Sequence, residues 1–305
     1  MDVLYFFENL RNPVLDTLMQ IVTELGSETC FLVAALVIYW CVNKRHGYYL
    51  MAVGFLGTIL NQFLKLFCRI PRPWMKDPNF TIVESARADA TGYSFPSGHS
   101  QTAVGNFGII AITAKRKWVR TLAILFAVLV PVSRMYLGVH TLADVAVGSL
   151  CALLLIVLLR PVVYSEKKWA IPALMGFMIF CGLGFLAYTE LAAFPQDIDA
   201  DNLAHAQKNA YTLLGSMAGF LLGYVIEVRK VNFTVNAVWW AQLLKIVLGL
   251  GLAVALKAGL KAPLMTLFDG HNMAHFVRYF VVVVFAALLW PMTFRFFSKL
   301  GGNKE

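Results

Sequence analysis

One short segment of the chain carries the residue types that a group-transfer enzyme needs. Residues 133–144 read SRMYLGVHTLAD and place Arg134, His140 and Asp144 between two long apolar runs. Because His140 and Asp144 are one helical turn apart, their side chains share a face if the segment is helical. A carboxylate beside an imidazole fixes the tautomer of the ring and raises the basicity of its free nitrogen. The pair therefore indicates an activated histidine, although a capping pair at a membrane edge has the same spacing.

Positive charge gathers where a second apolar run ends. The segment KLFCRIPRP, residues 65–73, places Lys65 and Arg72 at the boundary between apolar and polar sequence. In isolation the two cations are equally well explained as anchors that extend their charged ends to the membrane surface. Whether the two cations only anchor the helix or take part in chemistry depends on which residues lie beside them.

The sequence PSGHS, residues 96–100, predicts the start of a helix. Proline at a helix start, followed by Ser97 and Gly98, leaves backbone N–H groups exposed at the positive end of the helix dipole. An anion can bind there, and His99 would then lie beside it. The alternative is a plain helix start with an incidental histidine.

The three clusters together fit the requirements of phosphoryl transfer. Cations and backbone N–H groups neutralise the phosphoryl oxygens, one group attacks phosphorus, and another protonates the leaving oxygen. None of the clusters supplies carboxylate ligands for Mg²⁺. We therefore expect no metal and no other cofactor, and a route through phosphohistidine.

In order and spacing, the three segments resemble the signature of the type 2 phosphatidic acid phosphatase family. The pattern covers residues 65–144 and runs Lys65-x6-Arg72-Pro73, then Pro96-Ser97-Gly98-His99, then Ser133-Arg134-x5-His140-x3-Asp144. Each segment alone is a moderate signal, and the three in this order are highly specific. The resemblance implies a membrane phosphatase that acts on lipid phosphates.

The resemblance also implies a role for each matching residue. His140 would be the nucleophile that takes the phosphoryl group, and Asp144 would orient and polarise it. His99 would be the general acid for the leaving group and then the base for the attacking water. The implied phosphate-binding residues are Lys65, Arg72, Ser97, Gly98 and Arg134. Which histidine attacks follows from the family, because the residues by themselves leave that assignment open.

The composition identifies an integral membrane protein. Hydrophobic residues make up 59% of the 305 residues and charged residues only 14%, whereas soluble domains carry about 25% charged residues. The formal net charge of +9 lies in short clusters between apolar runs, and this pattern favours membrane topology over nucleic-acid binding. We expect the bilayer and a lipid phosphate as partners, and no nucleic acid; the sequence leaves the oligomeric state open.

We predict an all-α, polytopic transmembrane helix bundle with about nine spans, because a helix needs about 20 apolar residues to cross the hydrocarbon. Residues 1–26 are predicted to form an interfacial amphipathic segment, residues 27–160 a phosphatidic-acid-phosphatase-like catalytic core, and residues 161–305 an additional four-span region. The candidate spans are residues 27–43, 47–67, 99–115, 119–138, 142–160, 168–190, 207–227, 236–258 and 273–296.

Lysine and arginine residues gather in alternate connections, which predicts that these connections lie in the cytoplasm. The N-terminus is then outside and the C-terminus inside, and residues 68–98 and 134–141 share the outer face. Short loops favour a bacterial plasma membrane, with the active site on the periplasmic or extracellular side.

The function that these patterns favour is a metal-independent lipid-phosphate phosphatase. Undecaprenyl pyrophosphate, phosphatidylglycerophosphate, phosphatidate and sphingoid-base phosphates are all candidate substrates. A hydrolase of soluble phosphate esters that resembles glucose-6-phosphatase is an alternative, which the four added spans favour and Asp144 disfavours. A phosphate-binding transporter is another, favoured by the intramembrane cations Lys245 and Arg278.

The charged residues of the second half have two interpretations. Lys245 lies about nine residues into its predicted span, roughly 14 Å at helical rise, where an unpaired charge is costly. His275 and Arg278 lie nearer the outer end of the last predicted span, with Glu190 as a candidate partner. We favour helix packing as the role of this polar cluster over the binding of a lipid headgroup.

Overall fold

The computed structural model describes residues 1–88 and 90–300, and the regular structure within these residues is helical. The predicted all-α class is confirmed. The chain divides into two compact units. The first contains residues 1–34, 56–161 and 193–204, and the second contains residues 35–55, residues 162–192 and the chain from residue 205 onward.

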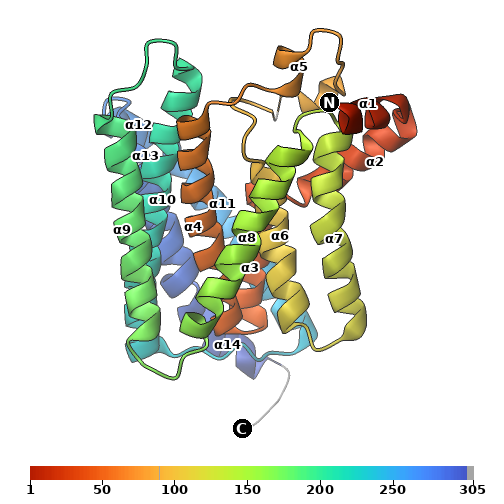
Figure 1. Ribbon diagram of the computed structural model, residues 1–305. Coiled ribbons are helices and arrows are strands. Elements are labelled where there is room, and N and C mark those ends of the chain that lie inside the picture. The colour runs from red at the N-terminus through yellow and green to blue at the C-terminus, as the bar shows by residue number, and fades with distance from the viewer. Residues whose placement is uncertain (89, 301–305) are drawn as a thin grey trace. The chain divides into compact units, whose positions relative to one another are not determined.

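The first unit contains the helices that carry the predicted chemical residues. They are α1 (Asp2–Asn9), α2 (Pro13–Glu24), the beginning of α3 (Glu28–Cys41), the later half of α4 (Lys44–Cys68), the short α5 (Pro73–Lys76), α6 (Gly98–Thr113), α7 (Lys117–Tyr136) and nearly all of α8 (Leu142–Val163). A single-turn helix, Glu84–Ala86, lies in the long connection between α5 and α6. Helices α6 and α7 run side by side (Figure 1), and α2 packs on α7.

Local sequence explains where two of these helices begin. Asn12 accepts a hydrogen bond from the backbone N–H of Leu15, and Pro13 occupies the first turn of α2, where an N–H would have no helical partner. Ser97 caps α6 in the same way by accepting from the backbone N–H of Ser100. The helix start predicted at residues 96–100 is confirmed by this cap.

The second unit holds the remaining α-helices of the described chain. They are α9 (Ala170–Leu191), most of α10 (Ala200–Ile226), α11 (Trp239–Gly259), α12 (Lys261–Leu267), α13 (Met273–Val284) and α14 (Phe294–Lys299), with the end of α3 and the beginning of α4. Single π-helical turns follow α10 at Glu227–Val231 and α13 at Phe285–Leu289, and a short 3₁₀ turn, Pro291–Thr293, precedes α14.

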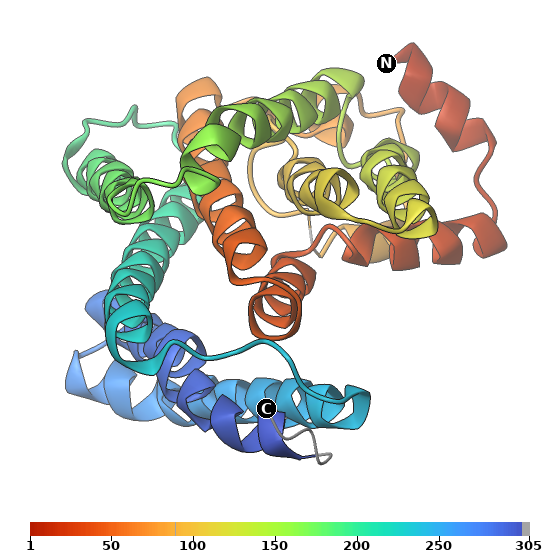
Figure 2. The same cartoon turned by 90° about the horizontal axis from the view of Figure 1, so that it is seen from below.

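Helices α10 and α13 approach each other closely through small residues. Gly215 and Gly219 of α10 face the backbone carbonyls of Phe276 and Phe280 of α13 so closely that a Cβ would not fit. Small residues let membrane helices pack at short range. Figure 2 shows the two helices, drawn in teal and blue, side by side.

Seven helical stretches of the described chain are long and apolar enough to cross a membrane. They are Lys44–Lys76, Lys117–Tyr136, Leu142–Val163, Ala170–Leu191, Ala200–Val231, Trp239–Leu267 and Met273–Lys299. Helices α2 and α3, bent by 49° from each other, raise the number to eight if they form one broken span.

Two of the predicted spans correspond to short helices. Residues 27–43 contain α3, with 14 residues, and residues 99–115 contain α6, with 16 residues. At helical rise these lengths give about 21 and 24 Å, less than a hydrocarbon core of about 30 Å. The count of nine spans, the N-out orientation and the three-part division of the chain therefore stay predictions, whereas the integral membrane class is confirmed.

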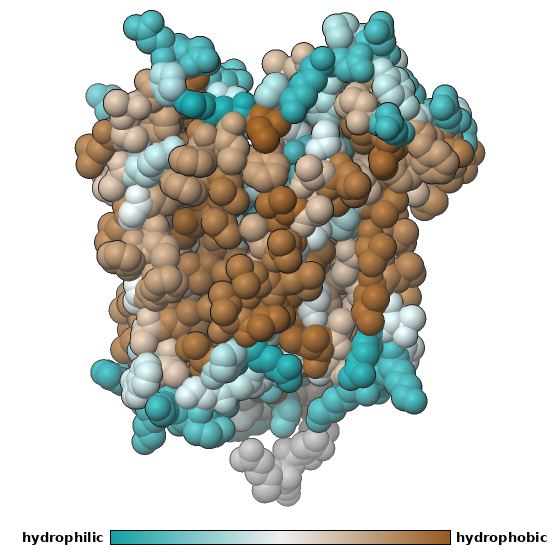
Figure 3. Space-filling view, viewed as in Figure 1, coloured by the Kyte–Doolittle hydropathy of each residue, from teal (hydrophilic) through white to brown (hydrophobic). Residues whose placement is uncertain are grey.

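Large apolar side chains are exposed on the surfaces of the long helices. Leu150 and Leu154 of α8 are exposed, and Figure 3 shows hydrophobic side chains over the middle of this face with hydrophilic ones toward its ends. The N-terminal helices α1 and α2 also expose large apolar side chains, including Phe6 and Val14. Exposed apolar residues of this kind suit the predicted interfacial segment.

Candidate active site

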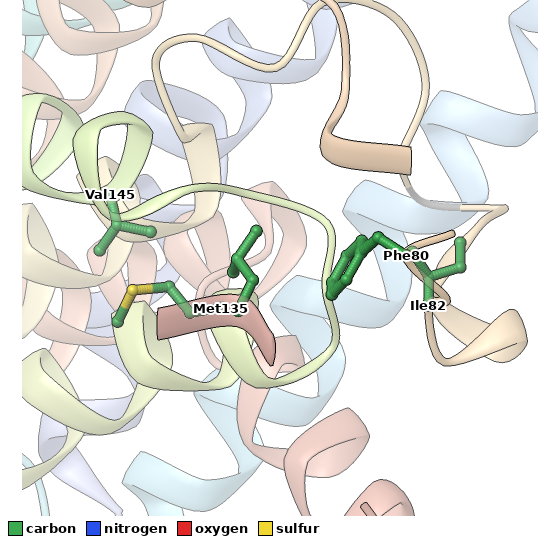
Figure 4. Packing of buried hydrophobic residues seen from close by; sticks show 5 residues of the cluster. Phe80, Ile82, Met135 and Val145 are labelled. Atoms are coloured by element: carbon green, nitrogen blue, oxygen red, sulfur yellow. The ribbon is translucent and has the colours of Figure 1, made fainter. Parts of the chain in front are cut away.

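The long loop between α4 and α6 is fixed to three helices by a small hydrophobic cluster. Phe80 and Ile82 of the loop pack with Met135 of α7, Val145 of α8 and Leu4 of α1, and all five side chains are buried. Figure 4 shows how the loop and helix residues of this cluster lie. Burial of one such side chain contributes about 1.5–3 kcal/mol. The cluster therefore holds the loop near the ends of α7 and α8, where the predicted chemical residues lie.

The N-terminal helices add hydrogen bonds to the same loop. The guanidinium of Arg11 donates to the carbonyls of Thr81 (2.8 Å) and Tyr136 (3.0 Å). The hydroxyl of Tyr5 donates to the carboxylate of Asp77 at 2.8 Å. The loop, α1 and the end of α7 are thus joined by both apolar and polar contacts.

His140 lies in the short connection between α7 and α8 and is 2% exposed. Gly138 has a φ of +80°, a conformation that favours glycine, and turns the chain there. Nη1 of Arg72 lies 3.0 Å from Nε2 and 3.5 Å from Nδ1 of His140, and it also donates to the carbonyl of Val139 at 2.9 Å. A guanidinium only donates hydrogen bonds, so we assign the lone pair to the nearer nitrogen, Nε2, and the proton of the neutral ring to Nδ1, which faces Asp144.

The Nδ1 side of the His140 ring faces Asp144 and Ser94. Nδ1 lies 3.7 Å from Oδ2 of Asp144, which is longer than a hydrogen bond, and 3.4 Å from Oγ of Ser94. Ser94 donates a hydrogen bond of 2.6 Å to the same Oδ2, and the backbone N–H of Thr141 donates another of 2.7 Å. The carboxylate is therefore oriented by two donors, and the Ser94 hydroxyl contacts both members of the predicted pair.

Sequence reasoning missed Ser94. The residue lies in a loop without periodic pattern, is fully buried, and donates its backbone N–H to the carbonyl of Ile70. The one available signal was a hydroxyl side chain shortly before Pro96, next to a predicted phosphate-binding segment. Its contact with Asp144 depends on how the loop folds back, which the sequence does not encode locally.

Arg72 and Lys65 are both oriented by backbone carbonyls of the loop. Nε of Arg72 donates to Gly92 at 2.8 Å and Nη2 donates to Thr91 at 2.7 Å. Nζ of Lys65 donates to the carbonyl of Tyr93 at 2.6 Å. The carbonyl oxygens orient both side chains without supplying a counter-charge.

Arg134 ends α7 and is 1% exposed. Its Nη1 atom donates to the hydroxyl of Thr23 at 2.9 Å, which connects α7 to α2. Its positive charge acts on Lys65, on Arg72 and on both predicted histidines. The three predicted cations thus share one electrostatic environment.

The start of α6 is tied to the first turns of α8. The backbone N–H of Ser97 donates to the carbonyl of Asp144 at 2.9 Å, and a Cβ on Gly148 would lie only 2.5 Å from the carbonyl oxygen of Ser97. Gly98 opens the helix and His99, which is half-buried, follows it. The three predicted cations act on the His99 ring. All eight predicted site residues belong to the first unit.

The environment of His140 favours its neutral form. Burial, followed by the positive charges of Arg72, Arg134 and Lys65, lowers the pKa of His140 well below its ordinary value. Desolvation disfavours the charged imidazolium, and nearby cations repel it. A neutral imidazole with its lone pair on Nε2 is the form that can act as a nucleophile.

Within residues 1–88 and 90–300, no group of three or more histidine, cysteine, aspartate or glutamate side chains could hold a metal ion. What these residues offer instead is a set of hydrogen-bond donors and positive charges around a neutral imidazole. Such an arrangement can bind a phosphate group and present a nitrogen nucleophile to it.

Two sequence-family profiles match the chain. The first, described as the PAP2 superfamily, matches residues 45–168, and the second, described as a PAP2 superfamily phosphatase transmembrane extension, matches residues 211–303. The first profile includes all eight predicted site residues, and the second covers much of the second unit.

Several curated proteins are similar in sequence. A phosphatidylglycerophosphatase B from Bacillus subtilis is 31% identical over 171 residues, which cover 52% of this chain and 79% of that protein. An undecaprenyl-diphosphatase from the same organism is 30% identical over 150 residues, 48% of this chain and 73% of the relative. A human sphingosine-1-phosphate phosphatase 2 is 27% identical over 217 residues, 69% of this chain and 52% of the relative. No solved structure matches the chain significantly.

Proposed function

Because this chain belongs to the PAP2 superfamily of phosphatases, we propose that it hydrolyses a lipid phosphate or diphosphate through a phosphohistidine intermediate at the non-cytoplasmic face of the membrane. The observation that carries this proposal is the state of His140. Its Nε2 lone pair faces the guanidinium of Arg72, and its Nδ1 faces Ser94 and Asp144. A phosphate that replaces His140 as the acceptor for Nη1 of Arg72 would therefore lie beside the attacking nitrogen.

The first half of the reaction forms the intermediate. Nε2 of His140 attacks phosphorus, and an N–P bond forms as the bond from phosphorus to the leaving oxygen breaks. The negative charge of the bound phosphate offsets the cations around His99, so that its ring can hold the proton that it gives to the leaving oxygen. The ring of His140 then carries a positive charge, which Asp144 stabilises from the Nδ1 side.

The second half of the reaction returns the enzyme to its starting state. Water attacks phosphorus and gives a proton to His99 as the N–P bond breaks. Inorganic phosphate leaves, His140 regains its lone pair on Nε2, and His99 is protonated for the next cycle. The scheme balances protons and charge without a metal or a further reactant.

The remaining predicted residues bind the phosphoryl oxygens. Lys65, Arg72 and Arg134 supply positive charge, and the start of α6 supplies the backbone N–H groups that follow Ser97. The Ser97 hydroxyl accepts from the N–H and the hydroxyl of Ser100, and neither bond uses its own proton. That proton is suitable as a donor to a phosphate oxygen.

A lipid substrate is favoured by the relatives and by the membrane setting. The three relatives described above are named for phosphatidylglycerophosphate, undecaprenyl diphosphate and sphingosine 1-phosphate, which are all lipids. A substrate of this kind keeps its tail in the bilayer while its phosphate reaches the cations. These names span monophosphates and diphosphates, so the substrate class is proposed at the level of lipid phosphates.

A phosphate-release assay with purified protein tests the function. The panel compares undecaprenyl pyrophosphate, phosphatidate, phosphatidylglycerophosphate, sphingosine phosphate and glucose 6-phosphate. We expect release from at least one lipid, resistance to EDTA, and sensitivity to vanadate. Release from glucose 6-phosphate alone would instead establish the soluble-substrate alternative, and binding without release would establish a carrier.

A variant pair tests the nucleophile within the same assay. His140→Ala removes the attacking nitrogen, and we expect a loss of at least about 10³-fold in kcat, as for other enzymes that lose their nucleophile. His205→Ala changes an exposed histidine of α10 and serves as the matched control. Activity of the His140→Ala variant equal to that of the control would refute the assignment.

A further inference from the structure

A second group of cations is formed by residues of the second unit. His275 and Arg278 lie one turn apart on α13 and are both buried, 7% and 6% exposed. Nη2 of Arg278 lies 2.9 Å from Nδ1 of His275. Because a guanidinium only donates, Nδ1 of His275 is the acceptor and its Nε2 carries the proton. The pair therefore presents N–H donors and no acceptor to its surroundings.

The charge of Arg278 has no carboxylate partner among the residues that the structure describes. Its Nε atom is buried without a hydrogen-bond acceptor, and its other recorded neighbour is the ring of Tyr279, 5.1 Å from the guanidinium carbon. Glu190, the partner considered from the sequence, is exposed and makes no recorded ion pair with Arg278 in the described chain. A buried cation without a counter-charge is costly in a membrane protein and is a candidate for a functional site.

Lys245, which is also buried in this unit, differs from Arg278 because its charged group has backbone carbonyls as hydrogen-bond acceptors. Lys245 is fully buried, and its ammonium donates to the carbonyls of Trp40 and Val235, both at 3.2 Å, and lies 4.3 Å from the centre of the Phe294 ring. Its hydrogen bonds connect α11 to the end of α3, which is the packing role favoured from the sequence. Arg278 lacks an equivalent set of acceptors.

Two exposed lysines extend the positive region toward solvent. Lys208 of α10 and Lys261 of α12 are exposed, and their charges act on the ring of His275 together with that of Arg278. Three helices thus contribute positive charge that acts on the His275 ring, and α12 packs against α13. Positive charge of this kind attracts an anion toward the buried donors.

We propose that Arg278, His275, Lys208 and Lys261 form an anion site that binds a phosphate group, either of a lipid headgroup or of free phosphate. Arg278 lies five residues into α13, about 8 Å along the helix from its start. Arg278 therefore lies near the start of a predicted span, where the interfacial layer with its lipid phosphates is expected. The site is independent of the proposed hydrolysis, because a phosphodiester headgroup that the phosphatase would not cleave can occupy it.

Thermal unfolding of the purified protein in neutral detergent tests this site. The probes are dioleoylphosphatidylglycerol, inorganic phosphate, and phosphatidylcholine as the lipid without net charge. A ligand that binds the folded state raises Tm, so we expect phosphatidylglycerol or inorganic phosphate to raise it and phosphatidylcholine not to do so. Which of the first two acts identifies the source of the phosphate. No rise with either would overturn the proposal.

Variants separate this site from the candidate active site. Because inorganic phosphate is also expected to bind the candidate active site, the comparison is made in the Arg72→Gln background. We expect the ligand-dependent rise in Tm to persist in Arg72→Gln and to be lost when Arg278→Gln is added, with Arg278→Lys intermediate. Loss in Arg72→Gln together with an unchanged rise in Arg278→Gln would assign the binding to the active site and refute the proposal.

A pair of substitutions at the protein surface tests the same anion site if changes at Arg278 prevent folding. Replacing both Lys208 and Lys261 by glutamine changes only exposed side chains, and we expect a two- to tenfold weaker apparent affinity, on the order expected for exposed charges. Replacing the exposed Lys168 and Lys230 by glutamine makes the same change of net charge elsewhere in the unit. Equal affinities for the two double variants would overturn the proposal.

Discussion

At the scale of single residues, the candidate active site carries more positive than negative charge. The carboxylate of Asp144 attracts the charges of Lys65 and Arg72, and Arg134 adds a third positive charge; the two arginines are buried. The hydrogen bonds of Arg72 go to carbonyls and an imidazole, which do not compensate its charge. A bound phosphate carries about two negative charges and would balance these cations. The positive charge thus explains the affinity expected for phosphate, and together with burial it favours the neutral state of His140.

Replacement of Ser94 by alanine tests its role as a positioning residue for Asp144. The change removes the 2.6 Å hydrogen bond to Oδ2 of Asp144. A hydrogen bond to a charged group is worth about 1.5–3 kcal/mol, so we expect kcat to fall about 10- to 100-fold with a smaller change in KM. The measurement is steady-state phosphate release, with Tm recorded for each variant.

The conservative variant Ser94→Thr separates positioning from folding. Threonine keeps the hydroxyl, so kcat of Ser94→Thr should return to within a few-fold of wild type while Ser94→Ala stays low at an unchanged Tm. If both variants lose activity in proportion to a fall in Tm, Ser94 has only a structural role.

The pH dependence follows from the lowered pKa of His140. The neutral ring attacks, and protonation of Nε2 abolishes attack, so a pKa below the ordinary value near 6.5 extends activity to more acidic pH. We expect the acidic limb of kcat/KM to lie below the ordinary histidine range, and an alkaline limb in kcat from the acid role of His99 in the substrate complex. The two limbs belong to the coupled site rather than to one histidine.

Lys65→Met tests the sign of this effect. Lys65 is one of the charges that lower the pKa of His140, so its removal should raise that pKa and move the acidic limb to higher pH. The overall rate should also fall, because Lys65 is a proposed phosphate ligand, and the readout is therefore the position of the limb. An acidic limb that stays in place or moves to lower pH would contradict the electrostatic account.

At the scale of helices, the site depends on how closely α6 and α8 approach. A Cβ on Gly148 of α8 would lie 2.5 Å from the carbonyl oxygen of Ser97. Gly148→Ala should therefore displace the start of α6, which carries His99, and misplacement of about 1 Å can cost about 10²-fold in rate. We expect kcat to fall by about 10- to 100-fold. Gly184→Ala in α9, where nothing lies within 4 Å of the added Cβ, is the control and should retain activity.

The helices that could be predicted from the sequence are those with a long apolar run or a recognisable start. Apolar runs indicated the long helices, and Pro96 with Ser97 indicated where α6 begins. Helix α6 is nevertheless 16 residues long, because apolar composition does not determine where a helix ends. The contacts of Ser94 were not predictable, because they depend on the path of a loop. The contact of Arg278 with His275 lies within one turn of α13, and its residues could be grouped from the sequence.

At the scale of the whole molecule, the distribution of basic residues determines the expected topology. Arg72 and Arg134 lie on the predicted outer side, yet both are buried and hydrogen-bonded. They are therefore constituents of the candidate site rather than the surface charges to which the positive-inside rule applies. With these two set aside, the exposed lysines of the alternate connections, such as Lys117 and Lys168, argue for a cytoplasmic location of those connections.

Cysteine labelling of intact cells tests this topology. The five native cysteines, which are free and partly buried, are first replaced by alanine, and single cysteines are then introduced at Asn79 and at Lys168, both exposed. We expect a membrane-impermeant maleimide to label Asn79→Cys in intact cells and Lys168→Cys only after permeabilisation. The opposite pattern would place the candidate active site in the cytoplasm. Because the catalytic residues and Asn79 share the first unit, this result also determines from which side of the membrane the lipid phosphate must be presented.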